Sequence, residues 1–426
     1  MQFGLRWYAV FAGGCLFLSG IDPVSAADPD WPEFRGPRGD GHVTAQRLPM
    51  HWSEASQVRW KTRIHDRGWS SPVIHGDQIW VTTATTDGHR MFAVCIDRNT
   101  GEIQHDFLVF EVDVPQKIAA ENSYATPTPV IDEQHVYLHY GTYGTACVET
   151  ASGRIKWVRR DLTCDHETGA GPASSPMLAG NMVIVHVDGR DVQYIIALDR
   201  ETGQTKWKTN RSVDFNSVPV NKRKAYSMPL LISDGKGQQL VSNGAQGIYG
   251  YHPDTGEELW RVRHHGFSNA PRPVFGQGFI FTTVDRDNPE LWAIRAGGQG
   301  DVTESHVVWK ERKAMPPRCS PLLYDNILLL INREGIATCL EAGSGKQVWK
   351  HRLDGRFSAS PLFWNGLIYL FNEDAVCTIL RAGPEFESIA ESRLDKDLLV
   401  ATPAVAENAL FVRTEKYLYR IDAPKD

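Results

Sequence analysis

Short runs of β-branched and aromatic residues alternate with turn residues along most of the chain. Runs such as GDQIWVTT, GNMVIVHV and NGLIYLFN are each bounded by Gly, Asn or Asp, which is typical of β-strands that end in tight turns. No segment shows a long helical period. The pattern therefore predicts an all-β chain built from many short strands.

A sequence repeat orders these strands. In IIALDRETGQTKW an apolar strand ends in an acidic turn, and Trp207 stands four residues after the turn glycine, Gly203. The same offset returns at Gly153 and Trp157, Gly256 and Trp260, and Gly345 and Trp349, whereas His105 follows Gly101. The strand before the turn and the strand that carries Trp are thus two parts of one repeating unit.

Each unit begins with a Pro that usually follows a small or hydroxyl residue. These prolines recur at similar intervals, and they are Pro72, Pro129, Pro176, Pro229, Pro273, Pro321, Pro361 and Pro403. A period of roughly 40–50 residues with several strands per unit is the signature of a β-propeller. The sequence predicts an eight-bladed β-propeller of four-stranded antiparallel blades.

The repeated tryptophans are expected to join the blades. A single four-stranded sheet cannot bury both faces alone, so neighbouring blades must stack around a ring. A large amphipathic ring covers apolar surface while its N–H donates to a carbonyl on the next blade. The predicted blade-docking residues are Trp60, Trp157, Trp207, Trp260, Trp309 and Trp349.

The two ends of the repeat region predict how the ring closes. The eighth unit, ATPAVAENALFVRTEKYLYRIDAPKD, lacks its fourth strand, whereas SQVRWKTRI near the N-terminus contains Trp60 and has no preceding partner strands. We expect residues 55–64 to complete the eighth blade, because closure hides two exposed sheet edges. The chain then holds one propeller domain, residues 55–426, after an N-terminal extension, residues 27–54, and is expected to be monomeric.

Residues 1–26 have the pattern of an export signal. Arg6 precedes an apolar stretch from Trp7 to Leu18, and Val24-Ser25-Ala26 is a small-residue cleavage site. The apolar stretch is too short to span a bilayer, and we predict no transmembrane segment. Cys15 raises the alternative of a lipoprotein, but Ala12 stands where such signals usually have leucine. We expect a protein exported to the periplasm or the exterior and soluble after cleavage.

The net charge bears on possible partners, and the positions of the cysteines bear on disulfide formation. A formal net charge of −6 does not supply the excess of positive charge that binding to nucleic-acid phosphates requires, so no nucleic-acid partner is expected. Cys95, Cys147 and Cys339 lie in different repeats, at the position that Ala197 occupies in its own. We expect them to be small buried residues rather than members of disulfides.

The phrase ALDRETGQTKW, from Ala197 to Trp207, resembles the repeat of the pyrroloquinoline-quinone-type (PQQ-like) propellers, over about Arg59 to Ile421. The opening WPEFRGPRGDG and the SSP strands are also similar to exported propellers of planctomycete-type bacteria. The resemblance implies three functional kinds: quinoprotein alcohol dehydrogenases, the BamB-like subunit of the outer-membrane β-barrel assembly machine, and sensor domains fused to serine/threonine kinases. The fold alone does not distinguish among these three functional kinds.

The enzyme alternative implies a cofactor site. Dehydrogenases of this family would hold PQQ on the ring axis over a calcium ion, beneath a vicinal disulfide. Here no two cysteines are adjacent, the haem motif Cys-x-x-Cys-His is missing, and no acidic run has complete calcium-loop spacing. We therefore expect no cofactor and no enzyme, with PQQ and calcium as the alternative.

Two histidines are candidates for a metal site. His139 and His186 occupy the same position in the second strands of adjacent repeats, so they could share a metal or a ligand. Two residues are fewer than a full ligand set, and hydrogen-bonded strand-end histidines are common. We expect no metal.

The mouth of the ring is the predicted contact site. Residues just before the axial strands include Trp69, Tyr226, Arg272, Arg318 and Arg356. Arginine and aromatic residues at a concave opening are typical of contact with a protein or an anionic ligand, although the arginines could instead form salt bridges between blades. The sequence favours a non-catalytic scaffold of the cell envelope that binds a protein partner or an anionic ligand; the alternative is a quinone-dependent oxidoreductase with an atypical site.

Overall fold

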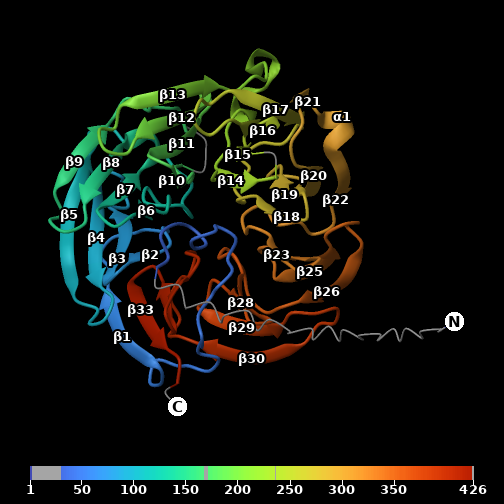
Figure 1. Ribbon diagram of the computed structural model, residues 1–426. Helices are drawn as coiled ribbons and strands as arrows, with labels where there is room; N and C mark the ends of the chain where they lie inside the picture. The colour runs from blue at the N-terminus through green and yellow to red at the C-terminus, as the bar shows by residue number, and fades with distance from the viewer. Residues whose placement is uncertain (2–29, 167–170, 236, 425–426) are drawn as a thin grey trace.

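Eight antiparallel sheets surround a central axis in the computed structural model (Figure 1). The structure describes Met1 and residues 30–166, 171–235 and 237–424. The predicted export signal and Cys15 lie outside these residues. The prediction of an all-β, eight-bladed propeller is confirmed, and no helix of the described part of the chain is long and apolar enough to cross a membrane.

The strands of each blade follow one another from the axis outward. The innermost strands are β2 (Val73–His75), β6 (Val130–Ile131), β10 (Met177–Ala179), β14 (Leu230–Ser233), β18 (Val274–Gly276), β23 (Leu322–Tyr324), β27 (Leu362–Trp364) and β31 (Ala404–Ala406). The second strands are β3 (Gln78–Ala84), β7 (His135–His139), β11 (Met182–Asp188), β15 (Gln238–Asn243), β19 (Phe279–Val284), β24 (Ile327–Ile331), β28 (Leu367–Phe371) and β32 (Ala409–Arg413).

The third and fourth strands form the outer half of each blade. The third strands are β4 (Arg90–Asp97), β8 (Thr145–Glu149), β12 (Gln193–Asp199), β16 (Gly247–Tyr251), β20 (Glu290–Arg295), β25 (Ile336–Glu341), β29 (Val376–Arg381) and β33 (Tyr417–Asp422). The outermost strands are β5 (Ile103–Glu111), β9 (Ile155–Arg159), β13 (Thr205–Asn210), β17 (Glu258–Arg263), β22 (Val307–Glu311), β26 (Gln347–Arg352), β30 (Ser388–Arg393) and β1 (Val58–Arg63). Blades 1 to 7 begin at β2, β6, β10, β14, β18, β23 and β27.

Blade 8 combines the two ends of the propeller. Its inner three strands are β31, β32 and β33, and β1 pairs antiparallel with β33 from Val58 opposite Ile421 to Arg63 opposite Tyr417. Figure 1 shows the blue β1 beside the red β33. The outermost strand of this blade therefore comes from the N-terminal side of blade 1.

Few elements depart from the four-strand plan. A short strand, β21 (Gly300–Asp301), runs parallel to β17 at the edge of blade 4, and the helix α1 (Thr303–His306) follows it. Three single-turn 3₁₀ helices are η1 (Gly141–Tyr143), η2 (Phe215–Ser217) and η3 (Val220–Lys222). All of them lie in connections and leave the ring intact.

The glycine-to-tryptophan offset has a physical basis in blade docking. The indole N–H donates to a backbone carbonyl of the next blade at 2.9–3.2 Å from Trp60, Trp157, Trp207, Trp309 and Trp349. The indoles of Trp60, Trp157, Trp207 and Trp309 also cover the turn glycine of that next blade: a Cβ on Gly203 would lie 2.7 Å from the Trp157 ring, and φ there is +70°. Only glycine combines this backbone conformation with this close approach.

Trp260 differs from the prediction. Its indole N–H donates to Oε1 of Gln239 at 2.6 Å, within its own blade, and the side chain is fully buried. It pairs with Gly250, where a Cβ would lie 2.2 Å from the indole, whereas the other docking tryptophans pair with residues that carry a side chain. The missing side chain at Gly250 lets the ring turn inward over the blade.

The cysteines lie in the sheets as small buried residues. Cys147 and Cys339 pair with Trp157 and Trp349, at the position where Ala197 pairs with Trp207. The six cysteines among the described residues are buried and unbridged. A small side chain beneath the indole is therefore what this position requires, and cysteine meets that requirement as well as alanine.

Candidate binding cup at the ring axis

An N-terminal segment, residues 31–43, crosses the ring axis. Trp31 pairs with Ile74 of β2, and the backbone N–H of Ile131 in β6 donates to the carbonyl of Pro32 at 2.9 Å. Farther along the segment, His42 pairs with Phe363 of β27 in blade 7. Figure 1 shows this blue segment in the middle of the ring. The segment covers the axis, and we call it the axial plug.

One buried ion pair anchors the axial plug. Arg272 is 1% exposed, and its guanidinium contacts Glu33 at 2.8 Å and donates to the carbonyl of Phe34 at 2.8 Å and to that of Pro229 at 3.2 Å. Burial raises the pKa of Glu33, and the charge of Arg272 counteracts that shift. The prediction that Arg272 lies on an exposed contact surface is therefore wrong, because its side chain points into the plug.

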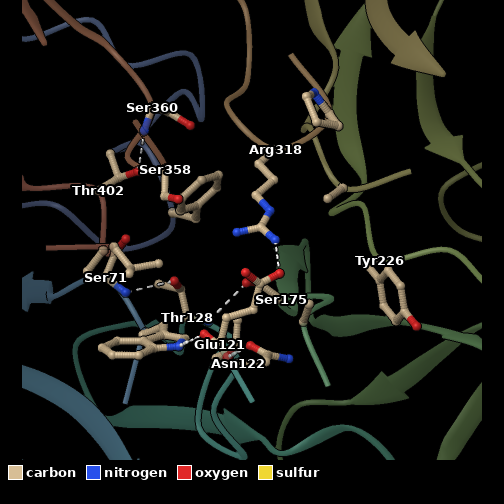
Figure 2. A pocket seen from close by; sticks show the side chains of 18 of the residues that line it. Ser71, Glu121, Asn122, Thr128, Ser175, Tyr226, Arg318, Ser358, Ser360 and Thr402 are labelled. Carbon is tan, nitrogen blue, oxygen red and sulfur yellow. Dashed lines mark hydrogen bonds and ion pairs between the residues drawn. The ribbon is translucent and has the colours of Figure 1, made fainter. Parts of the chain in front are cut away.

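A cavity of about 450 Å³ lies on the axis beside the plug. It is lined by the residues that precede the innermost strands, by Phe34 of the plug and by loops that follow the second and fourth strands. We call it the axial cup (Figure 2). Of the predicted mouth residues, Trp69, Tyr226 and Arg318 line it.

Hydroxyl groups line the wall of the cup and tie neighbouring blades together. The backbone N–H of Ser71 donates to Thr128 Oγ1 at 3.0 Å, and that of Thr128 donates to Ser175 Oγ at 2.9 Å. Ser360 and Thr402 repeat this contact at 2.9 Å between blades 7 and 8 (Figure 2). In each of these contacts, the backbone N–H just before the proline of a repeat unit is thus satisfied by a hydroxyl of the next blade.

Charged side chains gather at the mouth of the cup. Its lining includes three arginines and two glutamates: Arg286, Arg318, Arg333, Glu121 and Glu334. Arg318 and Arg333 both pair with Glu121, the latter at 3.0 Å. Burial would raise the pKa of Glu121, but the two guanidinium groups lower it below its usual value. The carboxylate is therefore ionised at neutral pH.

Arg356 takes a different place from the one predicted. Its side chain is 59% exposed, does not line the cup, and contacts Glu373 at 3.5 Å. Glu373 also pairs with Arg333 at 3.3 Å and accepts a hydrogen bond from Ser358 at 2.8 Å. Arg356 therefore lies beside the cup and contacts Glu373, the carboxylate that also pairs with the cup residue Arg333.

The two candidate histidines line a separate void of about 10 Å³, with Cys164 and His166. His139 Nδ1 lies 2.8 Å from Thr145 Oγ1, and His186 Nε2 lies 2.8 Å from Ser242 Oγ. Burial lowers the pKa of His139 to about 3 and that of His186 well below its usual value. Both imidazoles are neutral, and the described residues contain no group of three or more His, Cys, Asp or Glu placed to hold a metal.

Most charged residues of the cup were not among those predicted from the sequence. Arg286, Arg333 and Glu334 lie in loops between second and third strands, away from the proline that marks each unit. Glu121 lies in the connection between blades 1 and 2, where the interval from Pro72 to Pro129 is the longest of the series. The long interval indicated an inserted segment, but it did not indicate that this segment reaches the cup.

Comparisons with known proteins agree with this architecture. A family model described as outer membrane protein assembly factor BamB matches residues 115–209 and 244–382. No curated protein matches the chain. Among solved structures, BamB from Moraxella catarrhalis has a TM-score of 0.60 at 14% identity, covering 85% of this chain and 99% of its own.

Two further structures show that the fold is shared by unlike proteins. Quinohemoprotein alcohol dehydrogenase from Comamonas testosteroni has a TM-score of 0.66 at 10% identity, covering 93% of this chain and 81% of its own. The computationally designed Ika8 protein has a TM-score of 0.55 at 12% identity, covering 84% of this chain and 98% of its own. At these identities the likeness concerns the fold alone, and function must be argued from the cup.

Proposed function

We propose that this chain, which belongs to the PQQ-like propeller family whose model is described as outer membrane protein assembly factor BamB, is a non-catalytic binding scaffold of the cell envelope. The axial cup is its binding site for an acidic segment of a protein partner or a small anionic ligand. One observation supports this most: a cavity of about 450 Å³ with three arginines at its mouth, set on a closed ring.

The composition of the cup favours recognition over catalysis. Ligand sites are concave, largely apolar and carry a few placed polar groups, and the cup combines Phe34, Trp69 and Tyr226 with hydroxyls and arginines. The described lining contains no His, Cys, Asp or Lys. Hydroxyls such as Thr128 and Thr402 already accept backbone hydrogen bonds. A nucleophile with an adjacent base is the usual requirement for covalent catalysis. Among the lining hydroxyls, Ser358 has a carboxylate neighbour, Glu373 at 2.8 Å, but that carboxylate also pairs with Arg333 and Arg356.

The envelope location extends the same proposal. Residues 1–26 have the pattern of an export signal, and one solved structure of similar fold is a BamB protein. We propose that the protein works in the periplasm or outside the cell as a monomer.

The test is capture of partners from envelope extract with the purified protein. Replacing Arg286, Arg318 and Arg333 with alanine is expected to weaken capture more than about tenfold, because anchor arginines commonly contribute over about 1 kcal/mol each. A matched variant removes three exposed arginines of other strands and turns and should capture like the parent; these are Arg154, Arg381 and Arg393. If both variants lose capture equally, the proposal fails, because net charge and not the cup would explain binding.

The quinone-dependent alternative requires a calcium site in the cup. Calcium takes about six to eight oxygen ligands, including carboxylates, whereas the cup offers Glu121, whose two oxygens pair with arginines, and Glu334. These residues do not fit a quinone–calcium pair.

We expect PQQ with calcium to leave the melting temperature of the purified protein unchanged and to produce no alcohol-dependent dye reduction. A ligand at a hundredfold its dissociation constant stabilises a protein by about 2.7 kcal/mol, so binding would be visible in a thermal shift. A shift accompanied by turnover would replace the binding proposal with the oxidoreductase.

A further inference from the structure

Glu121 places a carboxylate of the protein itself in the mouth of the cup. It belongs to the connection between β5 and β6, whereas Arg318 and Arg333 belong to blade 6, across the ring. Arg318 Nη2 donates to Oε1 of Glu121, and Arg333 Nη1 donates to Oε2 at 3.0 Å. Figure 2 shows Arg318 and Glu121 pointing toward each other within the cup. Each carboxylate oxygen is thus bound by a different guanidinium.

The backbone around Glu121 is held independently of its carboxylate. The Trp69 indole N–H donates to the carbonyl of Glu121 at 3.1 Å, and Arg67 Nη1 donates to the carbonyl of Ala120 at 2.8 Å. Ser123 Oγ donates to the carbonyl of Arg67 at 2.8 Å. Because these contacts all lie on the blade 1 side, the side chain of Glu121 can leave the arginines while its backbone stays in place.

Arg333 also keeps its position without Glu121. Its Nε pairs with Glu373 at 3.3 Å, and Glu373 is held by Ser358. The side chains of Glu121 and Arg318 are 45% and 37% exposed. Ion pairs this accessible contribute little to stability, so a competing carboxylate can replace the internal one at small cost.

We propose that Arg318 and Arg333 form a carboxylate-binding subsite, and that Glu121 occupies this subsite in the free protein as an internal competitor. A ligand carboxylate displaces the Glu121 side chain and takes over its two charge-assisted contacts. This inference rests on the proposed function, namely that the cup is a binding site. It adds that the ligand carries a carboxylate and that the contact of Glu121 with the two arginines is autoinhibitory.

Succinate binding, measured by calorimetry at low ionic strength, tests the subsite. Glu121→Gln removes the competing charge while keeping the size of the side chain. If Glu121 fills the subsite about nine-tenths of the time, its removal raises apparent affinity about tenfold. We expect that gain in Glu121→Gln, and we expect Glu121→Gln combined with Arg318→Gln and Arg333→Gln to lose it.

The matched control is Glu334→Gln. Glu334 lines the same cup and carries the same charge, so a general electrostatic effect would raise succinate affinity equally in both variants. The subsite predicts a change of less than about twofold for Glu334→Gln, because that residue does not occupy the arginines. Equal gains, or no gain in a Glu121→Gln protein with the parent melting temperature, would overturn the inference.

The two proposals fail separately. A tenfold gain in succinate affinity with unchanged partner capture by the cup-arginine variant would support the subsite and reject the partner site. Loss of capture in that variant without any effect of Glu121→Gln on succinate binding would support the partner site and reject the internal competitor.

Discussion

Replacing Arg272 with alanine is expected to lower the free energy of unfolding by about 3–5 kcal/mol, because it leaves the buried carboxylate of Glu33 without its partner. The two side chains are 2% and 12% exposed, and Arg272 also satisfies the carbonyls of Phe34 and Pro229. The axial plug should lose its anchor to blade 5. Urea unfolding of the parent and the variant measures the effect.

Arg318→Ala is the matched control for this loss. Arg318 is also a cup-side arginine paired with a glutamate, but its side chain is 37% exposed, so the expected cost is below about 1 kcal/mol. The double variant Glu33→Ala with Arg272→Ala should be less unstable than the sum of the single variants, since neither charge is then buried alone. An Arg272→Ala protein as stable as Arg318→Ala would mean that the plug does not depend on this pair.

The ring could be predicted from the sequence because its evidence is local. The turn glycine and the tryptophan four residues later recur in register, and, apart from Trp260, the tryptophans contact the adjacent blade, as Trp157 contacts Gly203. The hydroxyl residue before most of the unit prolines was visible for the same reason, although the partner of its hydroxyl, the N–H of the preceding blade, appears only in the structure. Periodicity thus specifies the fold wherever a contact repeats.

The cup was predicted less completely because its charged contacts do not repeat. Glu121 and Arg318 are 197 residues apart, and no pattern in the chain relates them. Arg272 and Arg318 both precede an innermost strand, but Arg272 stands directly before Pro273 and Arg318 three residues before Pro321, and one points into the plug and the other into the cup. The opening WPEFRGPRGDG supplies the partners of Arg272, namely Glu33 and the carbonyl of Phe34.

Trp260 illustrates the same limit within the repeat itself. It keeps the offset from Gly256, but the neighbouring third strand has Gly250 where the other repeats have a side chain. A single absent Cβ redirects the indole from the next blade to Gln239 in its own. The offset predicts where such a tryptophan lies, and its partner strand decides which way the ring faces.

Removing residues 28–64 is expected to abolish cooperative folding and to give an aggregating product. The truncation removes β1, so the edge of β33 loses its pairing partner, and exposed edges promote association. It also removes the buried Trp31, Leu48 and Trp52 of the plug and extension and leaves Arg272 without Glu33. Circular dichroism melting and size-exclusion chromatography measure the outcome.

Two controls separate the contributions of the removed segment. A chain that begins at residue 30 keeps the plug and β1 and should melt like the parent. In Trp60→Ala the strand remains but the contact with Gly101 and the hydrogen bond to the carbonyl of Arg98 are lost. The expected cost is about 3 kcal/mol, the lower end of the range for core tryptophans, because Trp60 is only partly buried. We expect stability to fall from the parent to Trp60→Ala and again from Trp60→Ala to the truncation. This order follows if β1 closes the ring through both its strand pairing and its indole. A truncated protein that stays monomeric and melts as the parent does would show that the blade needs neither.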